Sequence, residues 1–278
     1  MNPGRTTLSD AQAFQAIRDW LYQETALAYP ESKRSFMERR LSDLVTEWGA
    51  RDLSDLWVKC QASESVRAAV IDGLTINETS FFRMPAQFEA LSALLPELAA
   101  RRRTGILDRP RLRLWSAACS TGEEPYSLAM TVLAQPDKSF TTEILATDLC
   151  RQALARAQRA TYADWRLENL PAGYKETYFT ADAAGIQLKP AVRDMVRFLP
   201  HNLKAPPPPG PWDVIFCRNV MIYFDNAFRT ELLRRLYDAL APGGLLFVGE
   251  GETLHLVPHD FETRPLAGAV VYRRPLKE

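Results

Sequence analysis

The sequence predicts an α/β domain built on a mostly parallel, doubly wound sheet, with an all-helical domain in front of it. From about residue 111, strand-like apolar runs alternate with amphipathic helical runs, which is typical of a parallel sheet with right-handed crossovers. Before about residue 100 there is no strand-like alternation, and apolar residues recur at helical spacing.

Composition restricts the class of protein. Apolar content is 46% and charged content 24%, as in ordinary globular proteins, and 34 basic residues balance 34 acidic ones, which argues against a nucleic-acid binder. No apolar stretch approaches membrane-spanning length, and the N-terminus MNPGRTTLSD lacks the apolar core of a signal peptide. We therefore expect a cytoplasmic protein without membrane insertion. The scattered cysteines and histidines lack metal-type spacing, so we expect no metal site.

The helical domain is expected over 1–76, with four helices. Ser9 can cap the first, and the others fit SKRSFMERRLSDLVTEWG, DLSDLWVKC and SESVRAAVIDGL. The segment NETSFFR and a long helix that begins at Pro85 form a connecting region, 77–104.

The α/β domain is expected over 105–278, with strands at RLRLWSAA, TTEILATDL, PWDVIFCRN and LLFVGE. The last stretch, FETRPLAGAVVYRR, reads as two strands. One antiparallel strand in an otherwise parallel sheet is allowed, and such a sheet resembles the Rossmann-like class I methyltransferase variant. The alternation is interrupted at about 165–200, where three apolar pieces predict a small inserted antiparallel sheet. The apolar residues that favour this reading over an irregular loop are Tyr178, Phe179, Ile186, Leu188, Val196 and Phe198.

The first strand-to-helix turn, ACSTGEE, indicates the ligand. Ligands of doubly wound sheets bind beyond the carboxyl ends of the strands, and Gly122 would let the backbone approach one closely. Two carboxylates there would repel a phosphate, so the ligand should present a cation or hydroxyls. S-adenosylmethionine does both: Asp148, which ends the second strand, suits its ribose, and Glu123 suits its amino group. Glu124 is expected to face solvent or cap the helix. The glycine-rich dehydrogenase fingerprint is absent.

The motifs NETSFFR, ACSTGEEPYS, ATD, HNL and CRNVMIYF resemble, in the same order, those of the chemotaxis-receptor glutamate O-methyltransferases, the CheR family. The motifs span residues 77–224, and the helical region and the inserted sheet also fit. The resemblance implies methyl transfer from S-adenosylmethionine to glutamate side chains of transmembrane chemoreceptors, with S-adenosylhomocysteine as the product.

The resemblance also implies roles for individual residues. Arg83 and Tyr223 would face the incoming glutamate as catalytic residues. The residues that would line the cofactor site are Asn77, Thr79, Arg83, Glu123, Asp148, Asn202, Leu203, Arg218 and Asn219. Phe81 and Phe82 are expected to pack where the two domains join, and Cys119 and Cys217 to be free buried thiols.

The expected partner is the cytoplasmic methylation region of a chemoreceptor, bound by a monomer. The basic residues of the second helical segment could dock it: Lys33, Arg34, Arg39 and Arg40. A solvated basic face explains them equally well. The short connection ADAAG in the inserted sheet, with Pro190 nearby, predicts that no receptor C-terminal pentapeptide is needed as a tether.

Two alternatives remain open. A methyltransferase acting on small molecules or nucleic acid would share the fold, but a base-modifying enzyme needs a cationic strand path, which the neutral net charge does not suggest. A catalytically silent receptor-binding module is the second. The joint presence of Asn77, Arg83, Glu123, Asp148 and Tyr223 argues against it.

Overall fold

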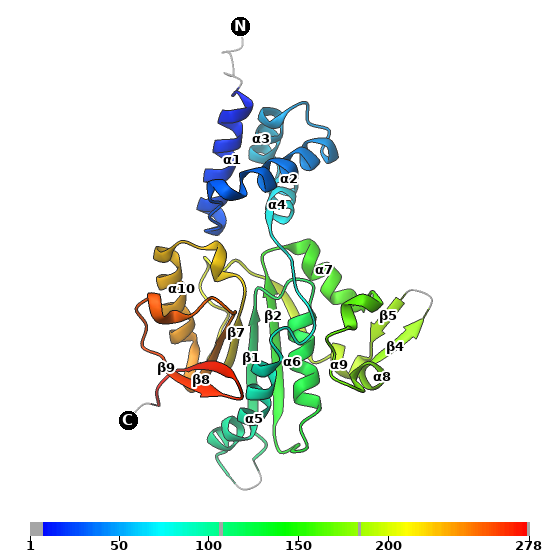
Figure 1. Ribbon diagram of the computed structural model, residues 1–278, viewed down its shortest axis with the longest axis vertical. Coiled ribbons are helices and arrows are strands. Elements are labelled where there is room, and N and C mark those ends of the chain that lie inside the picture. Colours follow the sequence, from blue (N-terminus) through cyan, green and yellow to red (C-terminus); the bar gives the residue numbers. More distant parts are fainter. Residues whose placement is uncertain (1–7, 106–107, 183–184, 277–278) are drawn as a thin grey trace. The chain divides into compact units, whose positions relative to one another are not determined.

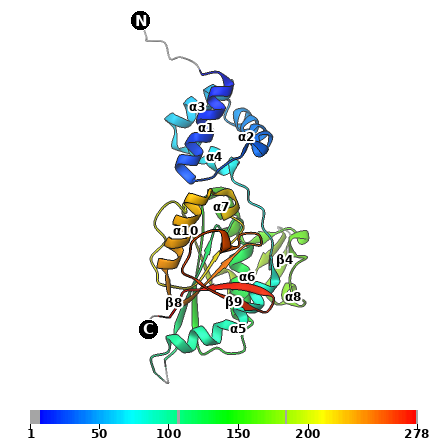
Figure 2. The same ribbon diagram turned by 60° about the vertical axis from the view of Figure 1, so that its left-hand side comes forward.

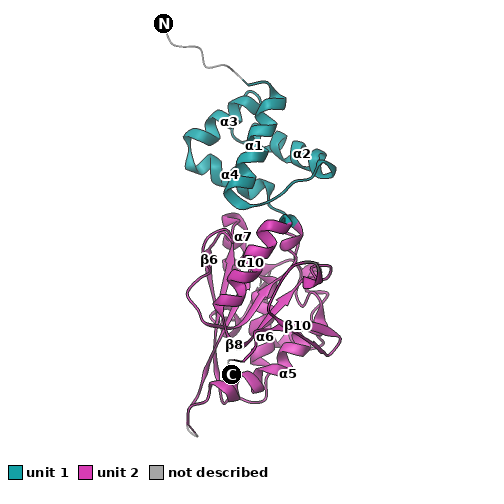
Figure 3. Ribbon diagram, turned by 90° about the vertical axis from the view of Figure 1, so that its left-hand side faces the viewer, with its two compact units in different colours: residues 1–76, 223–225 teal, residues 77–222, 226–278 magenta. Residues whose placement is uncertain are grey.

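The computed structural model describes residues 8–105, 108–182 and 185–276, which fall into two compact units (Figure 1, Figure 3). The first unit contains the chain up to Ile76 together with residues 223–225. The second contains 77–222 and the chain from Asn226 onward, so the segment NETSFFR is part of the α/β unit. The beginning of the N-terminal stretch MNPGRTTLSD and the centre of the connection ADAAG lie outside the described residues.

The first unit is helical, as predicted. Its elements are α1 (Asp10–Thr25), the 3-10 turn η1 (Glu31–Lys33), α2 (Arg34–Glu47), α3 (Leu53–Ala62) and α4 (Glu64–Leu74). A capping box starts α1: the Ser9 hydroxyl accepts from the Gln12 N–H at 3.3 Å, and the Gln12 side chain accepts from the Ser9 N–H at 2.9 Å. The helices share an apolar core that includes Ile17, Leu21, Met37, Leu41, Leu44, Leu56, Val70 and Leu74.

The second unit is built on a mixed sheet with the strand order β6-β2-β1-β7-β8-β10-β9. The strands are β1 (Arg111–Ala117), β2 (Thr141–Asp148), β6 (Val196–Pro200), β7 (Trp212–Cys217), β8 (Leu240–Val248), β9 (Glu262–Leu266) and β10 (Ala269–Arg273). The strands from β6 to β8 are parallel, whereas β10 is antiparallel to both β8 and β9. The predicted methyltransferase-type sheet is therefore confirmed.

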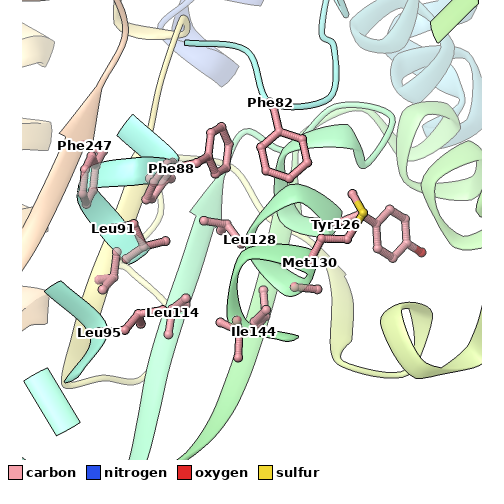
Figure 4. Close-up of a cluster of buried hydrophobic side chains, with 14 of the residues drawn as sticks. Phe82, Phe88, Leu91, Leu95, Leu114, Tyr126, Leu128, Met130, Ile144 and Phe247 are labelled. Atoms are coloured by element: carbon pink, nitrogen blue, oxygen red, sulfur yellow. The ribbon is translucent and has the colours of Figure 1, made fainter. Parts of the chain in front are cut away.

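Four helices pack against this sheet: α5 (Pro85–Arg102), α6 (Glu123–Leu133), α7 (Arg151–Arg159) and α10 (Asn226–Ala239) (Figure 2). The second unit also contains the short helices α8 (Tyr174–Tyr178) and α9 (Pro190–Arg193) and the 3-10 turns η2 (Asp164–Leu167) and η4 (Leu254–Leu256). A further 3-10 turn, η3 (Met221–Tyr223), ends in the first unit. α5 and α6 share one core with the sheet, in which Leu91, Leu95 and Leu128 pack with Leu114 and Phe247 (Figure 4). Among the described residues, no helix combines the length and the apolar character needed to span a bilayer.

A small antiparallel sheet is inserted after α7, in the order β3-β5-β4, with β3 (Thr161–Tyr162), β4 (Phe179–Asp182) and β5 (Gly185–Leu188). The insertion is confirmed, but its predicted third strand is wrong. Val196 and Phe198 lie in β6, which pairs with β2 in the main sheet and adds to the main core. Alternation of apolar residues predicts a strand but does not show which of two sheets the strand joins. The third strand of the small sheet is β3. Pro190 is not on a strand edge but begins α9.

Candidate active site

The carboxyl ends of the parallel strands meet at one edge of the main sheet. Ala117 is opposite both Thr147 and Cys217, Cys217 is opposite Val248, and β6 ends beside the end of β2. The chain leaves β1 toward β2 on one side and returns to β7 on the other, which is the switch point where doubly wound sheets bind ligands. At or just beyond these strand ends lie the predicted residues Glu123, Asp148, Asn202, Leu203, Arg218 and Asn219.

The turn after β1 has a strained backbone. Ala118, Ser120 and Gly122 have φ of 65°, 49° and 96°, in the left-handed region that residues with a side chain rarely adopt. A Cβ on Gly122 would lie 2.8 Å from the Cβ of Ala157 and 3.0 Å from the Tyr162 hydroxyl oxygen. Within the protein, glycine is required here by the close approach of α7 and Tyr162 and by the positive φ.

Asp148 is held by the backbone around it. One carboxylate oxygen accepts from the Ser120 N–H at 2.7 Å, and the other accepts from the Cys150 N–H at 2.8 Å. The residue is buried but keeps 7% of its surface exposed. Each carboxylate oxygen can accept more than one hydrogen bond, so a carboxylate held in this way suits hydroxyl ligands.

Glu123 exposes none of its surface. One of its oxygens accepts from the Thr121 hydroxyl and the other from Nη1 of Arg166, each at 2.7 Å. Arg166 lies in η2, in the inserted region, and sequence reasoning missed it because no recognisable motif surrounds it. Pairing with Arg166 compensates the charge that the fold buries at Glu123.

Glu124 is also buried, so the expectation that it faces solvent is wrong. It accepts from the Ser116 hydroxyl and from Nε of Arg218, each at 2.7 Å. Nη1 of Arg218 donates to the carbonyl oxygen of Arg83 at 2.7 Å and to the Gln87 side chain at 2.8 Å. The Arg218 guanidinium is therefore engaged within the protein and connects β7 to the NETSFFR segment.

Asn77 and Thr79 lie against the turn after β1 and against η2. The Asn77 carbonyl oxygen accepts from the Ser120 hydroxyl at 3.2 Å, and the Thr79 carbonyl oxygen accepts from Nη1 of Arg166 at 3.5 Å. The structure thus brings two predicted cofactor-site residues to the same place as Glu123 and Asp148.

Phe81 and Phe82 pack in the core, as predicted, but inside the second unit. The centre of the Phe81 ring lies 4.9 Å from that of the Tyr162 ring. The centre of the Phe82 ring lies 5.0 Å from that of the Phe88 ring, and both residues are labelled in Figure 4. Arg83 follows them with a half-buried side chain, whose Nη1 donates to the carbonyl oxygen of the residue five positions earlier at 3.2 Å.

The turn after β6 runs beside Asp148. The His201 N–H donates to the Asp148 carbonyl oxygen at 2.9 Å, and the Asn202 side-chain oxygen accepts from the Lys204 N–H at 3.0 Å. Leu203 is buried. Burial lowers the pKa of His201, so its imidazole is neutral at physiological pH.

Glu252, which sequence reasoning missed, organises the turn after β7. One carboxylate oxygen accepts from the N–H groups of Asn219 at 2.7 Å and Gly249 at 2.6 Å, and the other accepts from the Ile222 N–H at 3.2 Å. Asn219 has φ of 56°. Burial raises the pKa of Glu252 despite these hydrogen bonds. The only sequence signal was an acid just beyond a strand, which is too common to identify a function.

Tyr223 belongs to the first unit, where its carbonyl oxygen accepts from the Ala28 N–H at 2.8 Å. Arg83 belongs to the second. The two predicted catalytic residues are therefore parts of different units.

Arg34, one of the predicted docking residues, has acidic partners within its own unit. It pairs with Glu31 at 3.1 Å and with Glu38 at 2.7 Å. These neighbours compensate the positive charge that Arg34 could offer to another molecule.

Lys33, Arg39 and Arg40 are exposed. Lys33 ends η1 rather than lying in α2. Met37, which follows in α2, is fully buried in the helical core and is not part of an exposed face with these cations.

Cys119 and Cys217 are free and buried, as predicted. Burial raises the pKa of both thiols, which keeps them protonated. Within the described residues, no group of three histidine, cysteine or acidic side chains could hold a metal ion.

The side chains at this edge fit S-adenosylmethionine. Asp148 offers a backbone-oriented carboxylate to ribose hydroxyls. Glu123 and Arg166 place an anion beside a cation, which matches the charges of an amino-acid tail. A phosphate would meet the carboxylates of Glu123 and Asp148, so a phosphorylated nucleotide fits this donor set poorly.

Comparison with known proteins identifies the family. Residues 12–75 match the model described as "CheR methyltransferase, all-alpha domain", and residues 77–269 match "CheR methyltransferase, SAM binding domain". "Chemotaxis protein methyltransferase 2" of Vibrio cholerae is 35% identical over 95% of this chain and 93% of its own. "Chemotaxis protein methyltransferase" of Escherichia coli K12 is 35% identical over 96% and 92%.

Likeness to solved structures is weaker. A structure described as "DhpI-SAH complex structure" is 17% identical over 70% of this chain and 80% of its own, with a TM-score of 0.33, too low to bear on the fold. The two family models together cover nearly the whole chain, and the curated relatives match over almost their full lengths. The chain therefore belongs to the CheR methyltransferase family, with an all-α domain followed by the family's S-adenosylmethionine-binding domain.

Proposed function

We propose that this protein transfers a methyl group from S-adenosylmethionine to glutamate side chains in the cytoplasmic methylation region of transmembrane chemoreceptors. The resulting methyl esters would adjust receptor signalling, and the enzyme would act in the cytoplasm as a monomer. The observation that carries the proposal is that Asp148 and Glu123 both lie at the carboxyl edge of the sheet in a CheR-family domain. The names of the relatives support the choice of chemoreceptors as substrates.

In this proposal the cofactor lies along the edge of the sheet. Asp148 accepts from the ribose hydroxyls, and the charge of Glu123, which exposes none of its surface, attracts the amino group from within the turn after β1. Asn202, Leu203 and Asn219 line the site from the turns after β6 and β7, and Asn77 and Thr79 line it from the NETSFFR segment. Arg218 contributes through the loop that it holds, because its guanidinium is already engaged.

The acceptor needs no general base. A glutamate side chain has a reference pKa of about 4.3, so it is already ionised and nucleophilic at neutral pH. S-adenosylmethionine supplies an electrophilic methyl group on a sulfonium, and positive and negative charge disappear together during transfer. The protein therefore has to exclude water and align the carboxylate oxygen behind the methyl group.

Arg83 and Tyr223 are the residues proposed to align the acceptor. An arginine can hold a carboxylate through two parallel hydrogen bonds, and a tyrosine hydroxyl can add one. Both donors also make the carboxylate a weaker nucleophile. Their contribution is therefore orientation and not activation.

Docking of the receptor is proposed to use the positive charges of Arg34, Arg39 and Arg40 on α2 and of Lys33, which precedes this helix. A methylation region carries several glutamates, so attraction is expected. The ion pair of Arg34 with Glu31 weakens the attraction that Arg34 can contribute to docking.

Tethering by a receptor pentapeptide is proposed to be unnecessary. In the inserted sheet β4 lies at an edge and has four residues. A short edge strand offers little edge for β-augmentation. Titration with synthetic receptor C-terminal pentapeptides tests this. Micromolar binding, together with loss of methylation when the receptor tail is removed, would overturn it.

The function is tested by incubating the protein with labelled S-adenosylmethionine and membranes that contain a chemoreceptor. Base-labile label on the receptor is expected, because methyl esters hydrolyse in alkali. A catalytically silent module would bind receptor and release no label. Stable label, or label on a small molecule, would indicate another kind of methyltransferase.

A further inference from the structure

The backbone on both sides of Arg83 is strained. Phe82 has a φ of 48° and Met84 a φ of 61°, in the left-handed region that residues with a side chain rarely adopt. Such a conformation persists only where the surrounding structure holds it, and it is found most often at functional sites. The contacts that hold this segment therefore bear on Arg83, the arginine proposed to align the acceptor.

Two hydrogen bonds from other elements fix the segment. The Phe82 N–H donates to the hydroxyl oxygen of Ser127 in α6 at 2.9 Å, and Figure 4 shows Phe82 beside this helix. The Arg83 carbonyl oxygen accepts from Nη1 of Arg218 at 2.7 Å. Ser127 exposes none of its surface, so its bond to Phe82 is shielded from water.

The hydroxyl of Ser127 has a defined direction. It donates its one proton to the Glu123 carbonyl oxygen, one turn earlier in α6, at 2.7 Å. A lone pair of the same oxygen is then available to the Phe82 N–H. Alanine would serve a fully buried position of a helix better, because a serine hydroxyl competes with helical hydrogen bonding. The contribution of this hydroxyl is therefore to the strained segment and not to α6.

Thr131, one turn later in the same helix, provides a comparison. Its hydroxyl is also buried and donates to the carbonyl oxygen four residues earlier, that of Ser127, at 2.8 Å. Within the described part of the chain, only the Ser127 hydroxyl of these two accepts from the NETSFFR segment. The two hydroxyls thus share their role in α6 and differ in their relation to Arg83.

We propose that Ser127 is a positioning residue for Arg83. Its hydroxyl holds Phe82 in the left-handed conformation, and this conformation sets the direction in which the Arg83 side chain leaves the backbone. Without the hydroxyl, φ of Phe82 relaxes toward the negative values that L-residues prefer, and the acceptor loses its alignment with the methyl group. The role of Arg83 rests on the proposed function, whereas the hold of Ser127 on Phe82 does not.

The first measurement needs no substrate. Hydrogen exchange of the Phe82 amide, followed by NMR, is compared in the wild type, Ser127→Ala and Thr131→Val. Both variants lose a buried hydroxyl and its bond within α6, but only Ser127→Ala removes the acceptor of the Phe82 N–H. Exchange should become about 10-fold faster or more in Ser127→Ala and stay within about 2-fold in Thr131→Val.

The second measurement is the rate of receptor methylation. In Ser127→Ala, kcat should fall about 10- to 100-fold, because misplacement of an aligning group by 1 Å costs up to about 100-fold. The KM for receptor and the dissociation constant of S-adenosylhomocysteine should both stay within about 2-fold. Thr131→Val should retain the wild-type kcat.

Ser127→Ala leaves a buried N–H without an acceptor, so loss of alignment has to be distinguished from damage to the fold. A double-mutant cycle with Arg83→Ala makes this distinction. If Ser127 acts through Arg83, adding Ser127→Ala to Arg83→Ala lowers kcat no further. General damage would lower kcat again by the same factor.

Four results would overturn the proposal: unchanged exchange of the Phe82 amide in Ser127→Ala, a wild-type kcat in that variant, an equal loss in Thr131→Val, or a full further loss in the Arg83→Ala background. A failure of the proposed function is distinct, because the wild type itself would then form no receptor methyl ester. The exchange of the Phe82 amide would still decide whether Ser127 holds the segment.

Discussion

Replacing Glu252 with glutamine tests whether this buried carboxylate organises the turn after β7. The carboxylate accepts N–H groups at both oxygens, from Asn219 and Gly249 at one and from Ile222 at the other. A glutamine has one acceptor oxygen, so its NH2 group must face at least one of these donors. The least costly orientation keeps the two bonds of 2.7 and 2.6 Å and gives up the one of 3.2 Å.

A buried donor left without an acceptor costs about 1–3 kcal/mol. Removing a desolvated charge returns part of that cost, since burial raises the pKa of Glu252. We therefore expect the free energy of unfolding to fall by about 1–2 kcal/mol at neutral pH. Because Asn219 belongs to the same turn, cofactor affinity should fall as well.

The raised pKa gives the prediction a pH signature. Below the unfolded-state pKa of 4.5, protonated Glu252 makes its full contribution to the free energy of unfolding. This contribution is lost as pH rises through the higher pKa of Glu252 in the folded state. Glutamine does not titrate, so the variant lacks this loss. The free energy of unfolding of Glu252→Gln should therefore fall further below that of the wild type near pH 4.5 than at pH 8.

The assay is denaturant unfolding followed by circular dichroism between pH 4.5 and 8, with cofactor affinity measured in parallel. The control is Glu250→Gln, which removes an exposed charge two residues away. Equal stability of Glu252→Gln and the wild type at every pH, or an equal effect of the control, would refute the reasoning.

Three further changes test the remaining assignments. Asp148→Asn should raise the dissociation constant of S-adenosylmethionine about 10- to 100-fold, because a carboxylate oxygen that accepts hydroxyls becomes a donor; an unchanged constant in calorimetry would remove Asp148 from the ribose site. Arg83→Ala should abolish most turnover and leave cofactor binding reduced but measurable, and Tyr223→Phe should slow transfer less because one donor is lost; wild-type rates in Arg83→Ala would contradict its role. Reversal of Arg39 and Arg40 to glutamate should raise the Michaelis constant for receptor without changing cofactor affinity, and salt should weaken receptor binding by the wild type; salt-independent binding would argue against docking through α2.

Most of the fold follows from local patterns in the sequence. Alternating strands and helices predict the parallel sheet because crossovers impose that order, and FETRPLAGAVVYRR predicts the antiparallel end. The pattern could not assign Val196 and Phe198 to the correct sheet. An alternating apolar run specifies which face is buried, whereas its partner strand depends on contacts distant in sequence.

Some site residues could be located from the sequence because their place after a strand determines where they lie. Asp148 and Glu123 follow parallel strands, so the topology brings them to one edge. Arg166 and Glu252 were missed because their roles come from partners far away in the chain, at Glu123 and Asn219. The burial of Glu124 was missed for the same reason, since its partner Arg218 belongs to another strand.

All four cysteines of the chain are free, and each exposes at most 2% of its surface. Burial also raises the pKa of Cys60 to about 11, so its reactive thiolate form is scarce at neutral pH. Maleimide dyes should therefore react slowly with the native protein. A cysteine introduced at an exposed position such as Arg159 could then carry a fluorophore on the unaltered wild-type background, and receptor and cofactor binding could be followed by fluorescence without removing any native thiol.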